Sequence, residues 1–214
     1  GLILHLFKKD QIDRLAVVKK GLELVFTTLT QKKVYRIHPN SRSLENTKSK
    51  RESEKIQIGV FSNYSYNKNR HNQVAAALMV ENSEVHILGN NEFSYFGMDD
   101  RIKIHKELER EEFLNLVGSM DVNLYLSYSE SWGQVVTESV SKGVPCLTSN
   151  SSGIYDCNKS LSEQLVINEN DNPIEISKQL MKVLKFDFQN EFTTYLETLN
   201  ENSETLTSEF LNSY

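Results

Sequence analysis

The sequence has little cysteine and no long hydrophobic run. Its two cysteines, Cys146 and Cys157, lie outside any Cys-x-x-Cys or Cys/His spacing that could hold zinc. We therefore expect neither a disulfide framework nor a structural metal site. The longest apolar run, residues 74–80, is far shorter than the ~20 residues of a transmembrane helix. These absences predict a protein of the reducing cytoplasm, with at most peripheral membrane association.

Charge and composition select no class of partner. The net charge of the 214 residues is −5, and we expect no nucleic acid partner. An apolar share of 38% and a charged share of 25% are typical of a globular domain and exclude a disordered or fibrous chain. The chain begins at Gly1 without an initiating Met or the residue order of a signal peptide. We expect it to be a piece of a longer protein.

Short apolar runs alternate with amphipathic segments between residues 56 and 185. This alternation predicts parallel strands joined by right-handed helical crossovers, an α/β fold with a doubly wound sheet. In such sheets ligands bind beyond the carboxyl ends of the strands. The predicted strands are 56–61, 84–89, 102–104, 122–127, 144–148 and 165–167, and the predicted helices are 73–80, 109–117, 132–141 and 176–184. The acidic residues from Glu109 favour a helix start, Gly143 is predicted to stop the helix before it, and Asn172 and Pro173 are predicted to cap and open the last of these helices.

The two ends of the chain differ from this region. Residues 1–40 contain a short predicted strand between Val34 and Ile37, and we interpret them as the tail of another domain. Residues 41–55 have Leu44 as their only apolar residue, a composition typical of a linker or mobile loop. Residues 186–214 have the pattern of polar helix with sparse apolar anchors.

The segment from Ser127 to Thr148 is the most informative part of the sequence. Glu130 closes a predicted strand, and Gly133 allows backbone to approach a ligand without a Cβ in the way. The amides of Ser131, Trp132, Gly133 and Gln134 would form the open end of a helix, which suits a phosphate or a sugar hydroxyl. Glu138 follows eight residues after Glu130, roughly 12 Å along a helix. Such a pair fits an elongated ligand better than a glycosidase site, whose carboxylates flank one bond at about 5 to 9.5 Å.

This pattern resembles the Glu-x7-Glu signature of the retaining nucleotide-sugar glycosyltransferases of GT-B architecture, the glycosyl transferases group 1. Glu130, Gly133, Glu138, Gly143 and Pro145 reproduce it. The resemblance extends from about residue 56 to the C-terminus and implies the donor-binding half of such an enzyme. It implies a Rossmann-like donor domain over 56–185. Residues 1–40 would then end an N-terminal acceptor domain, and residues 186–214 would form helices that cross back to it.

The resemblance also implies roles for individual residues. Glu130 would contact the transferred sugar, and Glu138 would accept hydrogen bonds from the ribose hydroxyls. The family places an arginine and a lysine after the first strand of this domain to neutralise the diphosphate. Lys68 matches the lysine, whereas Asn63 stands at the arginine position, and Arg70 is a candidate substitute. Loss of one cation from this site would weaken transition-state stabilisation by a few kcal/mol, so the sequence leaves reduced or absent activity open.

Several of these residues have a structural interpretation beside the functional one. Lys68 and Arg70 also fit a solvated polar loop, and Trp132 fits a packing residue as well as a ligand contact. Cys146 fits a small buried hydrophobic residue. Four histidines show no spacing typical of metal ligands or of a nucleophile–base pair, and we interpret them as structural: His38, His71, His86 and His105.

The sequence therefore predicts sugar transfer from a nucleotide-diphosphate sugar with retention at the anomeric carbon. No side chain is an obvious covalent nucleophile, so we expect same-face displacement, with the departing diphosphate taking the proton of the acceptor hydroxyl. We expect no metal or other cofactor, and a glycan, lipid-linked or protein acceptor in surface polysaccharide synthesis.

Two alternatives remain. The first is a non-catalytic subunit that binds or stabilises a partner transferase, which Asn63 favours. The second, weaker one is a nucleotide-sugar epimerase, for which we find no additional acid/base pair.

Overall fold

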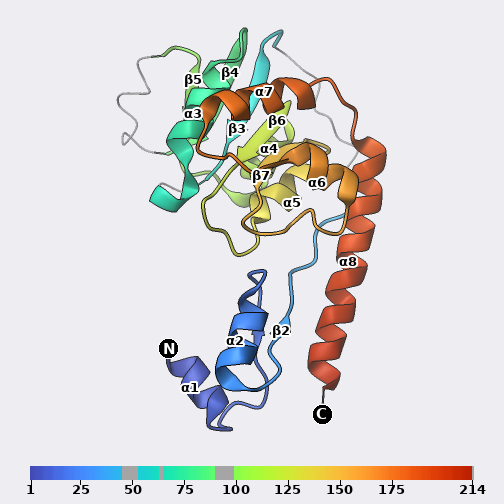
Figure 1. Ribbon diagram of the computed structural model, residues 1–214. Coiled ribbons are helices and arrows are strands. Elements are labelled where there is room, and N and C mark those ends of the chain that lie inside the picture. Colours follow the sequence, from blue (N-terminus) through green and yellow to red (C-terminus); the bar gives the residue numbers. More distant parts are fainter. Residues whose placement is uncertain (45–52, 63–64, 90–98, 214) are drawn as a thin grey trace.

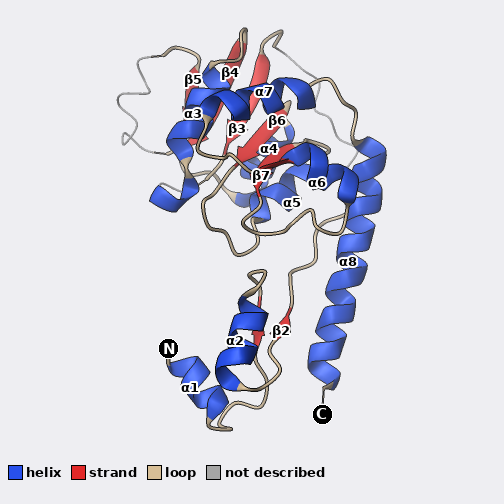
Figure 2. Cartoon of the chain, viewed as in Figure 1, coloured by secondary structure: helices blue, strands red, loops and turns tan. Residues whose placement is uncertain are grey.

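The computed structural model describes residues 1–44, 53–62, 65–89 and 99–213. The chain folds into a sheet-based body, a smaller N-terminal segment, and a long C-terminal helix that runs beside both (Figure 1). Figure 2 shows helices on both faces of the sheet. None of the described helices combines the length and the apolarity needed to cross a bilayer.

Within the described residues the sheet has six strands in the order β5-β4-β3-β6-β7-β8, and every neighbouring pair is parallel. This confirms the predicted doubly wound α/β fold. The strands are β3 (Ile56–Val60), β4 (Ser83–Leu88), β5 (Ile102–His105), β6 (Val122–Tyr125), β7 (Cys146–Ser149) and β8 (Val166–Ile167). The helices of the body are η1 (Tyr66–Lys68), α3 (Arg70–Leu78), α4 (Arg110–Gly118), α5 (Gln134–Ser141), α6 (Lys159–Leu165) and α7 (Pro173–Val183).

The central strands are buried on both faces of the sheet, and they include buried polar side chains such as Asn123 and Thr148. β6 and β7 are buried along their whole length, and Cys146 lies among these core residues as expected. Gly59 in β3 is required by close packing, because a Cβ there would lie 2.1 Å from Asn123 Oδ1. α7 begins as predicted, with the Asn172 side chain accepting a hydrogen bond from the Ile174 amide at 3.1 Å.

The starts of α3 and α5 differ from the prediction, and one helix was not predicted. α3 begins at Arg70, because Asn69 with φ +51 ends the preceding 3₁₀ turn and caps the helix. α5 begins at Gln134 rather than Trp132, because Gly133 has φ +90 and cannot be a helical residue. Its end at Gly143, with φ +74, agrees with the predicted glycine stop. α6 was not predicted, since its seven residues are too few to show a clear 3.6-residue period.

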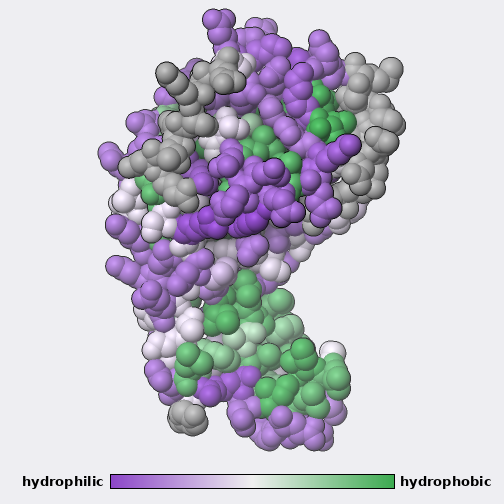
Figure 3. Space-filling model, turned by 180° about the vertical axis from the view of Figure 1, so that it is seen from behind, coloured by the Kyte–Doolittle hydropathy of each residue, from purple (hydrophilic) through white to green (hydrophobic). Residues whose placement is uncertain are grey.

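The N-terminal segment consists of α1 (Leu2–Lys8), β1 (Ala16–Val17), α2 (Leu22–Thr30) and β2 (Tyr35–Arg36). β1 and β2 form a separate two-stranded parallel sheet, of which only the second strand was predicted. Figure 3 shows apolar side chains gathered on the surface of the lower part of the molecule. Large apolar side chains of this segment that remain exposed are Leu2, Ile3, Leu24, Val25 and Leu29.

α8 (Gln189–Asn212) connects the two parts of the molecule. Its first half is buried against the body through Phe192 and Leu196, among others. Its second half runs beside β2, where the rings of Phe210 and Tyr35 meet edge to face with centroids 5.6 Å apart (Figure 1). Most of the predicted linker, residues 45–52, lies outside the described residues. The start of this linker is attached to α8. The Ser41 amide donates a hydrogen bond to Asn200 Oδ1 at 2.7 Å, and the Ser41 carbonyl accepts one from Asn200 Nδ2 at 3.1 Å.

Candidate functional site

A cavity of about 1060 Å³ lies at the carboxyl ends of β3, β4 and β6, where the body faces the N-terminal segment. Its position is the one that parallel sheets use for ligands. Its walls come from the ends of these strands, the start of α4, the start of α5, and residues 37–39. The lining residues used below are His38, Arg70, Arg110, Tyr125, Glu130, Ser131, Trp132, Gly133, Gln134 and Glu138.

The start of α5 forms one wall of this cavity. Gly133 takes the left-handed conformation that glycine adopts without a Cβ penalty. Since no side chain among the described residues caps the helix, its first amides are available to a ligand, and they carry the positive end of the helix dipole. Ser131 and Trp132 belong to the loop before the helix. The predicted group of amides therefore comes partly from this loop and partly from the start of α5.

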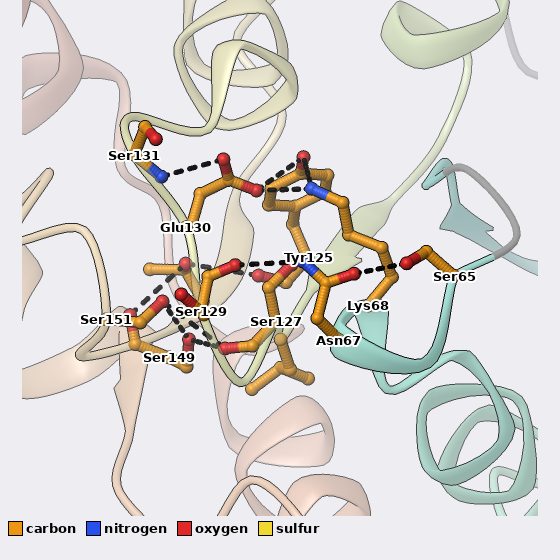
Figure 4. A network of polar contacts seen from close by, with 12 residues as sticks. Ser65, Asn67, Lys68, Tyr125, Ser127, Ser129, Glu130, Ser131, Ser149 and Ser151 are labelled. Atoms are coloured by element: carbon orange, nitrogen blue, oxygen red, sulfur yellow. Dashed lines mark hydrogen bonds and ion pairs between the residues drawn. The ribbon is translucent and has the colours of Figure 1, made fainter. Parts of the chain in front are cut away.

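Glu130 lies at the centre of a hydrogen-bonded network between η1 and the loop that follows β6 (Figure 4). Its Oε2 accepts hydrogen bonds from Lys68 Nζ and, at 2.9 Å, from the Tyr125 hydroxyl. Its Oε1 accepts one from the Ser131 amide at 2.9 Å. Lys68 Nζ also donates to the Tyr125 oxygen at 2.9 Å. The network thus connects two loops that are distant in the sequence.

The network keeps both members of its ion pair charged. Burial by itself would raise the pKa of Glu130, but the hydrogen bonds from Lys68, Ser131 and Tyr125 hold that pKa below its ordinary value. Burial likewise opposes the charge of Lys68, and its hydrogen bonds to Glu130 and Tyr125 raise the pKa above the usual lysine range. Lys68 contacts Glu130 and Tyr125, which line the cavity, and its predicted contact with phosphate stays a prediction.

The second carboxylate of the motif has a cation partner as well. Glu138 is buried, and its Oε1 lies 2.7 Å from Nη2 of Arg110, the first residue of α4. Arg110 is a candidate site residue that the sequence reasoning missed. The acidic helix start at Glu109 predicted α4, yet no spacing in the sequence indicates that α4 packs beside α5.

The other predicted residues occupy different parts of the cavity. Arg70 is buried and donates to the Leu88 carbonyl at the end of β4. Gln134 is the first residue of α5 and lines the cavity. Asn63 lies outside the described residues, so its position stays a prediction.

Trp132 combines packing with a place in the cavity wall. Its ring stacks on the His38 ring, with centroids 4.5 Å apart and planes 6° from parallel. His38 was interpreted as structural; it is buried as expected, and burial lowers its pKa. It is also part of the cavity lining, which the sequence reasoning did not predict. The stack therefore joins residues 37–39 to the loop that carries the motif.

The family can be identified from the sequence profile of Glycosyl transferases group 1, which matches residues 41–201. This chain belongs to that family. The family is named for the transfer of glycosyl groups, and the match covers most of the chain. No curated protein sequence matches the chain significantly.

Solved structures show the same fold at low sequence identity. A mutant of TarM from S. aureus, in complex with fondaparinux, alpha-GlcNAc-glycerol and UDP, superposes with a TM-score of 0.70 at 13% identity, covering 95% of this chain and 44% of that one. Sucrose-phosphate synthase of Thermosynechococcus elongatus gives 0.70 at 15% identity, covering 95% and 57%. WaaG, a glycosyltransferase of lipopolysaccharide biosynthesis, gives 0.61 at 16% identity, covering 90% and 58%. The chain thus spans about half the length of these structures.

Proposed function

We propose that this chain is the donor-binding part of a retaining glycosyltransferase and that its cavity binds a nucleotide-diphosphate sugar. The observation that carries the proposal is the shared cavity wall formed by Glu130, the open start of α5, and Glu138. The wall offers an acid, a group of backbone donors and a second acid in that order. A ligand with a sugar, a diphosphate and a ribose presents complementary groups in the same order.

Each group of the wall has a proposed partner on the donor. The amides at the start of α5 would bind the diphosphate, with Arg70 as the nearby cation in the cavity lining. Glu130 would orient the transferred sugar through a hydroxyl group. Glu138 would accept hydrogen bonds from the ribose hydroxyls and would share its charge with Arg110 when the donor is bound.

The proposed reaction is a displacement on one face of the sugar ring. The bond between the anomeric carbon and the phosphate oxygen breaks, and its electron pair remains on the departing diphosphate. The acceptor oxygen forms the new bond on the same face, and its proton passes to the diphosphate. The ion pair of Lys68 and Glu130 beside the sugar would stay intact throughout. A reaction without metal, and an acceptor from surface polysaccharide synthesis, stay predictions.

Nucleotide titration of a Glu138 variant tests this proposal. UDP and ADP are titrated by calorimetry into the full chain and into Glu138→Ala. Charge-assisted hydrogen bonds contribute about 1.5 to 3 kcal/mol, so we expect the variant to bind the preferred nucleotide about 10- to 100-fold more weakly. Glu163→Ala is the matched control, because the Glu163 side chain is exposed on α6 and pairs only loosely with Lys159 at 3.7 Å. Equal binding by wild type and Glu138→Ala would contradict the assignment of the ribose.

The second candidate function is a non-catalytic subunit that binds or stabilises a partner transferase. It is favoured by the engagement of Lys68, since the cation expected at the diphosphate is bonded to Glu130 and Tyr125. The same titration distinguishes the two functions. If the wild-type chain binds neither nucleotide, the subunit is the better description.

A further inference from the structure

We propose that Tyr66 and Tyr128 form a platform for a neutral oligosaccharide beside the donor cavity. Tyr66 belongs to η1 and is 92% exposed, and Tyr128 lies in the loop between β6 and α5 and is 41% exposed. Their ring centroids are 5.9 Å apart, with planes inclined by 36°. Two neighbouring aromatic rings left in water are typical of a binding surface. This inference rests on the proposed function, because it assigns the platform to the acceptor.

Both rings are carried by backbone that is held firmly in place. The Tyr128 amide donates to the Asn67 carbonyl at 2.7 Å, and Asn67 Nδ2 donates to the Ser129 carbonyl at 3.3 Å. Figure 4 shows Asn67 and Lys68 of η1 reaching across to Ser129 and Glu130. Because η1 and the loop are already ordered and a tyrosine ring has only two rotatable side-chain bonds, little conformational entropy is lost when a ligand covers the rings.

The groups around the rings indicate a neutral, hydroxyl-rich ligand. Asn72 Nδ2 lies 3.3 Å from the Tyr128 hydroxyl, and Ser129 Oγ accepts from Lys19 Nζ at 2.6 Å. Amides and hydroxyls next to aromatic faces suit a sugar ring, which presents an apolar C–H face for stacking and hydroxyls at its edge. The Tyr128 and Ser129 hydroxyls accept these hydrogen bonds and can still donate one each, a capacity that a purely apolar peptide would not use. The described cations next to the rings are Lys19 and the ion-paired Lys68, which is too little positive charge for a nucleic acid backbone.

The platform is continuous with the proposed site of transfer. Tyr66 lies two residues before Lys68 and Tyr128 two residues before Glu130, and these two charged groups are bonded to each other. A sugar chain that rests on the two rings would therefore end next to the Glu130 network, where the anomeric carbon of the donor is proposed to lie. We infer that the platform orients the acceptor and contributes to its affinity rather than to the binding of the nucleotide.

The test measures oligosaccharide and nucleotide binding separately on the full chain. Maltohexaose, cellohexaose and chitohexaose are titrated, without nucleotide, into wild type, Tyr66→Ala, Tyr128→Ala and Tyr66→Phe. At least one sugar should bind, and each alanine variant should weaken its binding by about 3- to 10-fold. Tyr66→Phe should keep affinity within about two-fold of wild type, since the ring is retained. Phe186→Ala is the control for removal of another exposed aromatic ring.

UDP and ADP affinity of the same variants separates the two proposals. Both alanine variants should bind nucleotide as wild type does, which also shows that they are folded. The platform would be refuted if none of the three sugars binds, or if the alanine variants bind sugar as tightly as wild type. If Glu138→Ala loses nucleotide binding while Tyr66→Ala binds sugar as tightly as wild type, the donor site is supported and the platform is refuted.

Discussion

Replacing Lys68 by methionine tests whether the Glu130 network is a stabilised ion pair. The side chains of Lys68 and Glu130 are only 14% and 17% exposed, so the charge left on Glu130 in Lys68→Met would be poorly solvated. Methionine retains most of the length of the lysine stem. The variant therefore removes the cation while leaving the packing of the stem largely unchanged.

The expected loss follows from the contacts that remain. Removing one partner of a fully buried ion pair costs about 3 to 5 kcal/mol. Glu130 would keep its hydrogen bonds from the Tyr125 hydroxyl and the Ser131 amide, and it has some contact with solvent. We expect the free energy of unfolding to fall by about 2 kcal/mol. For a chain of this length, that corresponds to a decrease in Tm of about 4 to 8 °C.

A double-mutant cycle isolates the pair from other effects. Thermal unfolding of wild type, Lys68→Met, Glu130→Gln and the double variant should give a coupling energy of about 1 to 2 kcal/mol. The contact of Lys68 Nζ with the Tyr125 ring, 5.0 Å from its centroid, is lost with or without Glu130 and cancels in the cycle. The exposed pair Lys159–Glu163 is the matched control, with an expected coupling below about 0.5 kcal/mol.

The pH dependence of the same variants gives an independent check. Because the pKa of Glu130 is held below 4.5 in the folded chain, the network stabilises fully above that pH and loses its effect as pH falls through the folded value. In Lys68→Met, burial dominates and Glu130 is protonated more easily. The difference in Tm between wild type and variant should therefore shrink between about pH 7 and about pH 4. A coupling energy indistinguishable from that of the exposed control pair would refute this account of the network.

Two further predictions concern backbone strain and histidine burial. Gly133→Ala and Gly21→Ala should each cost about 1 to 2 kcal/mol, since their φ values are +90 and +85. Calorimetry should show weaker nucleotide binding only for Gly133→Ala; equal effects of both variants would contradict a role for the start of α5. Burial and the neighbouring His105, with a smaller contribution from Lys103, lower the pKa of His86 to about 4, against an opposing effect of Glu84. Between pH 6.5 and about pH 4 the unfolded chain binds a proton at His86 and the folded chain does not, so the free energy of unfolding, measured with urea, should fall as the pH decreases towards 4. This fall should be less steep in His86→Gln. The same pH dependence in wild type and variant would contradict the assignment.

The local pattern of the sequence determined the sheet and the position of the motif. Alternating apolar runs predicted the six strands of the body, because a strand or helix must bury an apolar face whatever its partner is. Gly143 and Asn172 also predicted helix ends, since capping depends on residues within one turn. The seven residues of α6 carried too little periodicity to be recognised.

Only the tertiary structure decided which side chains meet. The pairs Lys68–Glu130 and Arg110–Glu138 and the stack of His38 on Trp132 join elements that are distant in the sequence. Such contacts depend on strand order and on which helices become neighbours, and a single sequence does not encode them in any local spacing. The sequence therefore determined where the two carboxylates of the motif lie along the chain. The packing of α4, η1 and residues 37–39 around them determined that both carboxylates line one cavity and that each is paired with a cation.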